Sequence, residues 1–187
     1  MSILTPTHSR FSLFAARLLV LAGALLSFAT SAQTAAEITQ LMQQGQHQQA
    51  LQRAEKLIAE HPDNPHPLFL KGVILSEMGR AKEAIPLFTQ LTQDYPELAE
   101  PYNNLAVIYA QQRQYDKAKY ALEMALRANP GYATAHENMG DLHVRLAVIA
   151  YDKAIQLDAA SATAQKKFSL ARDLLTLQPA SAKTLGK

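Results

Sequence analysis

The 187-residue sequence contains no cysteine and no tryptophan. Without cysteine the chain forms no disulfide, holds no metal through thiolates, uses no thiol nucleophile and carries no lipid on sulfur. Charged residues make up 18% of the chain and apolar residues 48%, which is a balance typical of a globular protein and not of a disordered one. These absences exclude several kinds of chemistry and leave a chain that can fold around a core.

Charge is almost absent from the start of the chain. Arg10 and Arg17 are the only charged residues among residues 1–32, and an apolar run from Leu18 to Ala29 follows them. A basic start, a short apolar run and small residues before a cut after Ala32 are typical of a secretory signal peptide. We therefore expect residues 1–32 to be removed and the protein to be periplasmic. The alternative is an uncleaved segment that anchors the protein in the inner membrane.

The remainder of the chain is electrically neutral. Residues 33–187 hold 16 Lys and Arg, because two of the 18 lie in the leader, against 16 Asp and Glu. The pI of 8.8 for the full chain is therefore no sign of a basic binding surface. We expect no nucleic-acid partner.

A repeat with a period of about 34 residues organises this neutral part. Pro62, Pro96 and Pro130 are separated by one constant interval. Three further sets keep the same interval: Ala50, Ala84 and Ala118; Gly72, Ala106 and Gly140; and Gly45, Gly79 and Arg113. Several independent columns with one period indicate a repeat architecture.

Each unit is predicted to form two amphipathic helices joined by a turn. In the second unit Gly79 suits the left-handed position that ends the first helix, and Pro96 ends the second helix. The small residues at the positions of Gly72, Ala106 and Gly140 are expected to face the second helix, where a small side chain lets two helix axes approach closely. Such a hairpin is expected to stack on its neighbours.

The pattern resembles the tetratricopeptide repeat family. The second unit carries its motif as Leu68, Gly72, Leu75, Ala84, Phe88 and Pro96, and the third as Tyr102, Leu105, Ala106, Tyr109, Ala118, Leu122, Ala125 and Pro130. The first unit is weaker and retains Leu41, Gly45, Ala50, Ala54 and Pro62. The resemblance implies an all-α fold, a right-handed α-solenoid of stacked helix-turn-helix repeats.

The predicted domain spans residues 33–177, with repeats at about 33–64, 65–98 and 99–132 and a shortened fourth repeat at 133–160. In the fourth repeat the second-helix pattern starts at Ala147, five residues before the place that the period assigns to it, Asp152. Since no Gly, Pro or Asn interrupts Asp141 to Asp158, we predict one continuous helix from about Ala133 to Asp158, with a tight turn near Arg145 as the alternative. Residues 162–177 are predicted to cap the stack, and residues 178–187 to form a disordered tail.

The first helices of such a stack line its concave side, which is expected to bind a protein or an extended peptide segment. The residues predicted to line this groove are Phe69, Leu70, Val73, Glu77, Asn103, Asn104, Val107, Gln111, Glu137, Asn138, Asp141 and Arg145. Asn104 and Asn138 are one repeat apart and are expected to lie side by side, where their amides suit a peptide backbone. Glu77, Glu137 and Asp141 favour a basic or neutral ligand over a carboxylate.

Catalysis is not predicted. His136 and His143 occupy the columns of Tyr102 and Tyr109, so we interpret them as packing residues between helices and not as metal ligands. The chain has no HExxH, no GxSxG and no glycine-rich phosphate loop. We expect no catalytic residues, no metal, no cofactor and no small-molecule substrate.

The sequence thus predicts an exported, non-catalytic module for protein binding that acts as an adaptor or assembly factor of cell-envelope machinery. Two alternatives stay open: a membrane-tethered scaffold, if the leader is retained, and a regulatory accessory subunit of a separate enzyme. A homodimer is also compatible with a short array whose end is uncapped.

Overall fold

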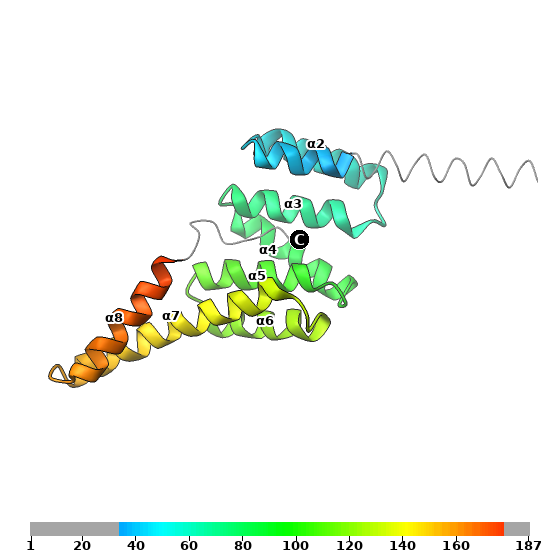
Figure 1. The fold of residues 1–187 in the computed structure, drawn as a ribbon. Helices are drawn as coiled ribbons and strands as arrows, with labels where there is room; N and C mark the ends of the chain where they lie inside the picture. The colour runs from blue at the N-terminus through cyan, green and yellow to red at the C-terminus, as the bar shows by residue number, and fades with distance from the viewer. Residues whose placement is uncertain (1–33, 178–187) are drawn as a thin grey trace, which may run out of the picture.

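The structure is a computed structural model that describes residues 34–177 (Figure 1). A helix over residues 34–43 comes first. It is followed by α2 (His47–Glu60), α3 (Pro65–Glu77), α4 (Ala81–Asp94), α5 (Ala99–Gln111), α6 (Tyr115–Ala128), α7 (Ala133–Leu157) and α8 (Ala162–Thr176). The predicted signal peptide and tail lie outside the described residues.

The turn inside each of the first three units is built in the same way. Gly45 and Gly79 have φ of 72° and 73°, and Arg113 takes the same left-handed place with φ of 59°. After each of them the next backbone N–H reaches back to the carbonyl five residues earlier, as Arg80 N does to Leu75 O at 2.8 Å. This bond ends the first helix and redirects the chain into the second.

The turn between units also repeats, and its spacing reveals where the fourth unit is short. The backbone N–H groups of Asn64, Leu98 and Tyr132, which are one full period apart, each donate to the carbonyl three residues earlier at 3.1 Å. Ser161 makes the same bond at 3.2 Å, but it comes five residues sooner after Tyr132 than the period requires. The fourth unit therefore lacks five residues.

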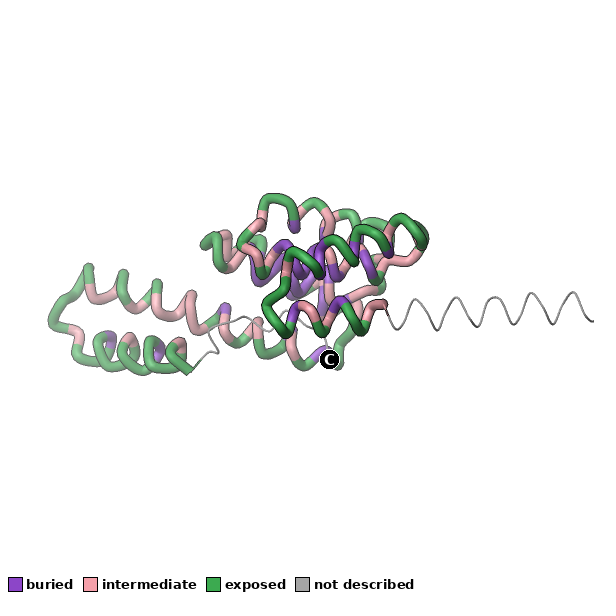
Figure 2. The backbone as a smooth tube through the Cα atoms, turned by 90° about the horizontal axis from the view of Figure 1, so that it is seen from above, coloured by how far each residue is buried: buried purple, intermediate pink, exposed green. Residues whose placement is uncertain are grey.

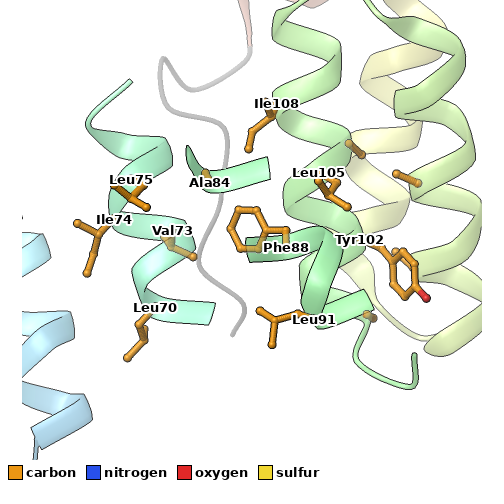
Figure 3. Packing of buried hydrophobic residues seen from close by; sticks show 14 of the residues in the cluster. Leu70, Val73, Ile74, Leu75, Ala84, Phe88, Leu91, Tyr102, Leu105 and Ile108 are labelled. Carbon is orange, nitrogen blue, oxygen red and sulfur yellow. The ribbon is translucent and has the colours of Figure 1, made fainter. Parts of the chain in front are cut away.

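The hairpins close through small residues, as predicted for the second and third units. Gly72 in α3 leaves room for the Phe88 ring of α4, and an added methyl carbon would lie 2.7 Å from Phe88 Cε1. Ala106 and Ala118 are buried in the third unit, with 1% and 0% of their surfaces exposed. Figure 3 shows the Phe88 ring between the apolar side chains of α3 and those of α5. One continuous core results.

The fourth unit contains no turn. α7 runs unbroken over 25 residues from Ala133 to Leu157, which confirms the predicted continuous helix and not the strained turn. Its first part packs against α5 and α6, and its second part leaves the stack, where α8 lies along it (Figures 1 and 2). Among α2 to α8, α8 contacts α7 alone. Residues 162–177, predicted to cap the exposed end of the stack, thus form α8 and pack on α7, the last helix of the array before them.

The same straight helix overturns two predictions about packing. Gly140 was expected to face a second helix, but it is exposed and nothing lies within 4 Å of an added methyl carbon. His136 and His143 were expected to pack between helices, and both are exposed. The second helix that would cover these three residues continues along the axis of α7 instead of folding back.

Candidate functional site

The first helices of the units form one side of the stack. α3 contacts α5 and α5 contacts α7, whereas α2, α4 and α6 do not contact one another. The stack therefore curves toward the surface formed by α3, α5 and the first part of α7, which we call the inner layer. The predicted groove residues lie in the helices on this side.

The predicted groove residues all lie in the helices of the inner layer, and they differ in exposure. Glu77, Gln111 and Glu137 are exposed, and Phe69, Asn138, Asp141 and Arg145 are half-buried. The buried ones are Leu70, Val73, Asn103, Asn104 and Val107. The structure therefore places the predicted set together but leaves only part of it at the surface.

The apolar part of the predicted groove belongs to the protein's own core. Leu70 and Val73 are 3% and 0% exposed and pack in the main apolar cluster. The Phe69 ring is half-buried and lies against the Phe88 ring, with the two ring centroids 5.9 Å apart and the ring planes tilted by 56°. Phe69 is the one apolar member of the set that still offers surface to a ligand.

Two asparagines form a link between α5 and α7 that the sequence did not predict. Asn138 Nδ2 on α7 donates to Asn103 Oδ1 on α5 at 2.7 Å. Asn104 Nδ2 instead donates to the carbonyl of Glu100 in its own helix at 2.9 Å. Asn138 therefore pairs with Asn103, and the repeat spacing gave no signal for this pair.

Asn103 is also the one predicted residue with an unused donor in the interior. Its side chain is 0% exposed, and its Nδ2 is buried with no acceptor in hydrogen-bonding distance among residues 34–177. A buried amide donor without a partner costs about 1–3 kcal/mol. Native proteins rarely leave such a group unsatisfied unless a ligand or water completes it.

The charges of the inner layer lie on its accessible residues. Glu77 Oε2 lies 3.6 Å from His47 Nδ1 of α2. Glu137, Asp141 and Arg145 follow one another along the first part of α7, so acidic groups outnumber basic ones on this surface. A ligand that carries positive charge or none is favoured there.

The ring of His136 is held by the chain's own backbone. His136 Nε2 lies 2.9 Å from the carbonyl oxygen of Pro130, which fixes the ring to the turn before α7. Within residues 34–177 no three His, Asp or Glu side chains are grouped so that they could hold a metal ion. None of the helices described there combines the length and the apolar character needed to cross a membrane.

Sequence reasoning missed an open cleft at the other end of the stack. It lies between the helix over residues 34–43 and α2 and has a volume of about 380 Å³. Glu37 and Arg53 line it and form an ion pair at 3.2 Å. Exposed polar side chains make up most of the lining, so the cleft suggests no particular ligand.

Comparisons with known proteins agree with the repeat architecture. The family model of the Psidin N-terminal TPR repeats region matches residues 35–168. The tetratricopeptide repeat domain-containing protein PYG7 of Arabidopsis thaliana is 32% identical over 89 residues, which are 45% of this chain and 30% of that protein. The phagocyte signaling-impaired protein of Drosophila pseudoobscura pseudoobscura is 30% identical over 87 residues, 46% of this chain and 9% of that protein. The chain thus spans less than a third of either relative.

Solved structures share the fold at low sequence identity. TTC0263, a thermophilic TPR protein of Thermus thermophilus, superposes with a TM-score of 0.60 at 20% identity, over 78% of this chain and 82% of that one. MamA of Desulfovibrio magneticus RS-1 superposes with a TM-score of 0.52 at 21% identity, over 79% and 76% of the two chains. A chain of the Naa15/Naa10 complex bound to HypK-THB gives 0.56 at 16% identity, over 77% and 22%.

The repeat period, the hairpins that close on small residues and the match over residues 35–168 lead to one assignment. The chain belongs to the tetratricopeptide repeat family.

Proposed function

We propose that this protein is an exported, non-catalytic interaction module that binds an extended segment of a partner protein across the inner layer. In the cell it would act as an adaptor or assembly factor of envelope machinery. The fold supports this function, because stacked helical hairpins offer an extended concave surface and no enclosed active site. A related fold occurs in a chain of the Naa15/Naa10 complex, which is a protein assembly.

The observation that carries the proposal is the buried Nδ2 of Asn103, which has no acceptor within the described chain. The Oδ1 of the same amide accepts a hydrogen bond from Asn138 Nδ2, which fixes the orientation of the amide within the inner layer. A backbone carbonyl of an extended segment is a suitable acceptor for such a donor. The partner would thus contribute the hydrogen bond that the folded chain leaves unmade.

The surrounding charges suggest the chemistry of the segment. Glu77, Glu137 and Asp141 lie on the helices of the inner layer, where Arg145 is the one basic member of the predicted set. Phe69 adds a half-buried aromatic surface. We therefore propose a segment that carries Lys or Arg and has an apolar side chain near the α3 end of the layer.

The binding proposal is tested with Asn103→Leu, compared with Gln93→Ala on the exposed side of α4. Leu fills a similar volume without a polar group, so the domain should stay folded while binding of the partner falls by at least tenfold. A photo-crosslinker at residue 137 should give an adduct that Asn103→Leu abolishes and Gln93→Ala preserves. An adduct of equal yield in both variants would place the partner elsewhere.

Export depends on residues 1–32, whose composition suits a signal peptide. Mass spectrometry of the protein recovered from the periplasm should give an N-terminus at residue 33. A full-length N-terminus in the membrane fraction would favour the tethered scaffold. An enzyme that co-purifies in fixed stoichiometry would favour the role of an accessory subunit.

A further inference from the structure

The fourth unit contains both helices of a hairpin without the turn that would close it. Aligned at the five-residue gap, Ala147, Tyr151 and Ala154 of α7 occupy the places of Ala118, Leu122 and Ala125 of α6. α8 follows the start of α7 by one period less the same five residues, so it occupies the place of the first helix of a fifth unit. The second part of α7 is therefore a second helix that is fused end to end with its own first helix.

In the complete units the second helix covers the first. α4 packs on α3 and places the Phe88 ring over Gly72. α6 packs on α5 and buries Ala118, Leu122 and Ala125, with 0%, 2% and 0% of their surfaces exposed. These hairpin contacts are the main internal contacts of each unit.

In the fourth unit the first side of this contact is uncovered, and the second side is covered only in part. On the first part of α7 the residues at the crossing, His136, Gly140 and His143, are exposed, and Gly140 has open space in front of it. On the second part Ala147, Tyr151 and Ala154 are half-buried, because α8 packs beside them and Lys167 Nζ of α8 lies 5.8 Å from the centroid of the Tyr151 ring. At 100° per residue all six positions fall on one face of the straight helix.

We propose that a second copy of this chain covers that face, and that two α7 helices pair side by side in antiparallel directions. Gly72 meets Phe88 within the second unit, and the equivalent pair in the fourth unit is Gly140 and Tyr151. In the dimer Tyr151 of one copy packs over Gly140 of the other. The two-fold axis then passes midway between positions 140 and 151, near Arg145 and Leu146. Each copy completes the other's fourth hairpin.

A second copy fits better than an unrelated partner because the two complementary halves of the contact already lie on one helix. An antiparallel pair brings both halves together twice, which is the self-complementary surface that two-fold symmetry requires. The helix itself cannot close on its own first half, since α7 is about 37 Å long and has no break. When the connection between two elements of one chain is too short to close, two copies can exchange the identical element, which is called domain swapping. The missing turn of the fourth unit is such a connection. In this arrangement α8 also comes to cap the partner's stack.

Cysteines test the pairing directly, because the chain contains none of its own. In Gly140→Cys combined with Tyr151→Cys the two thiols lie three turns apart on one helix, about 16 Å, which is too far for an intrachain disulfide. Mild oxidation should therefore give a dimer on a non-reducing gel. Ile149→Cys with Gln156→Cys, two exposed positions on another face, should not crosslink. Equal crosslinking of both pairs, or of neither, would refute the pairing.

Restoring the missing turn is the second test. Insertion of Arg-Gln-Tyr-Asp-Lys, copied from residues 113–117, after Leu146 gives the fourth unit the length of the third. Light scattering of the full-length protein should show twice the monomer mass for the wild type and a monomer for this insertion. The same five residues inserted after Leu177 should leave the dimer intact. A monomeric wild type at about 100 µM, or a dimer that survives the first insertion, overturns the proposal. Either result leaves the binding function of the inner layer untouched.

Discussion

The substitution Gly72→Ala measures how closely α3 and α4 approach. The added methyl carbon would lie 2.7 Å from Cε1 and 2.8 Å from Cζ of the Phe88 ring, whereas unstrained carbon contacts lie at about 3.5–4.0 Å. Phe88 is 0% exposed and packs in the main apolar cluster, so its ring cannot turn out into solvent. Overpacking of this kind costs about 1–3 kcal/mol. The helix gains about 0.5–1 kcal/mol from Ala, which leaves a net loss of about 0.5–2 kcal/mol.

Gly140→Ala is the matched control, because it makes the same change at the same place of the repeat. No atom lies within 4 Å of the added carbon, so only the gain in helix propensity of about 0.5–1 kcal/mol remains. Both variants are measured at a protein concentration low enough to keep the chain monomeric, because in the proposed dimer Tyr151 of the second copy would cover Gly140. The two substitutions should therefore change stability in opposite directions.

Urea unfolding followed by circular dichroism measures both variants against the wild type. We expect the midpoint to fall for Gly72→Ala and to rise for Gly140→Ala, with the two free energies of unfolding about 1–3 kcal/mol apart. Equal shifts for the two variants would show that the close approach at Gly72 does not hold the hairpin together. The reasoning about small residues at the crossing would then be wrong.

Three further predictions concern single sites. Ala118→Leu should cost about 1–3 kcal/mol by overpacking the third hairpin, and an unchanged melting temperature would show that the crossing lies elsewhere. Burial raises the pKa of Tyr132 from 10.0 to about 12, so the folded state favours the neutral phenol and loses about 2–3 kcal/mol of stability as the pH rises from 10 to 12. Tyr132→Phe should remove that alkaline loss in pH-dependent urea unfolding. The Asn64 side chain caps α3, because its Oδ1 accepts a hydrogen bond from His66 N at 3.0 Å. Asn64→Ala should lower the free energy of unfolding by about 1 kcal/mol, measured by thermal unfolding. Asn64→Asp keeps an oxygen acceptor and should have a stability close to that of the wild type.

The repeat units could be predicted from the sequence because their signals are local. Gly45 and Gly79 adopt the left-handed angles that the pattern required, and Pro96 follows the end of α4. Gly72 sits against Phe88 as the small-residue column implied. Each of these features depends on residues within one hairpin. The same signals also recur in successive repeats, so the pattern is visible more than once in the sequence.

The exposure of the predicted groove residues was harder to derive from the sequence, because the direction of a side chain on a helix changes with every residue. Successive positions on a helix differ by 100°, so neighbouring residues have different surroundings: Asn103 accepts a hydrogen bond from Asn138 of α7, and Asn104 donates one within its own helix. The burial of Leu70 and Val73 in the core likewise depends on how the layers pack. The repeat period identified the helices of the inner layer. It did not identify which side chains of those helices remain accessible to solvent.

The sequence by itself determined where helices begin and end, including the unbroken α7, since Gly, Pro and the caps act on the chain at short range. Only the tertiary structure decided what those helices touch. Once five residues are missing, the second part of α7 has to continue straight, and so Gly140, His136 and His143 stay uncovered while α8 packs on α7 alone. These contacts join residues far apart in the chain, and the direction of one rigid helix sets all of them together.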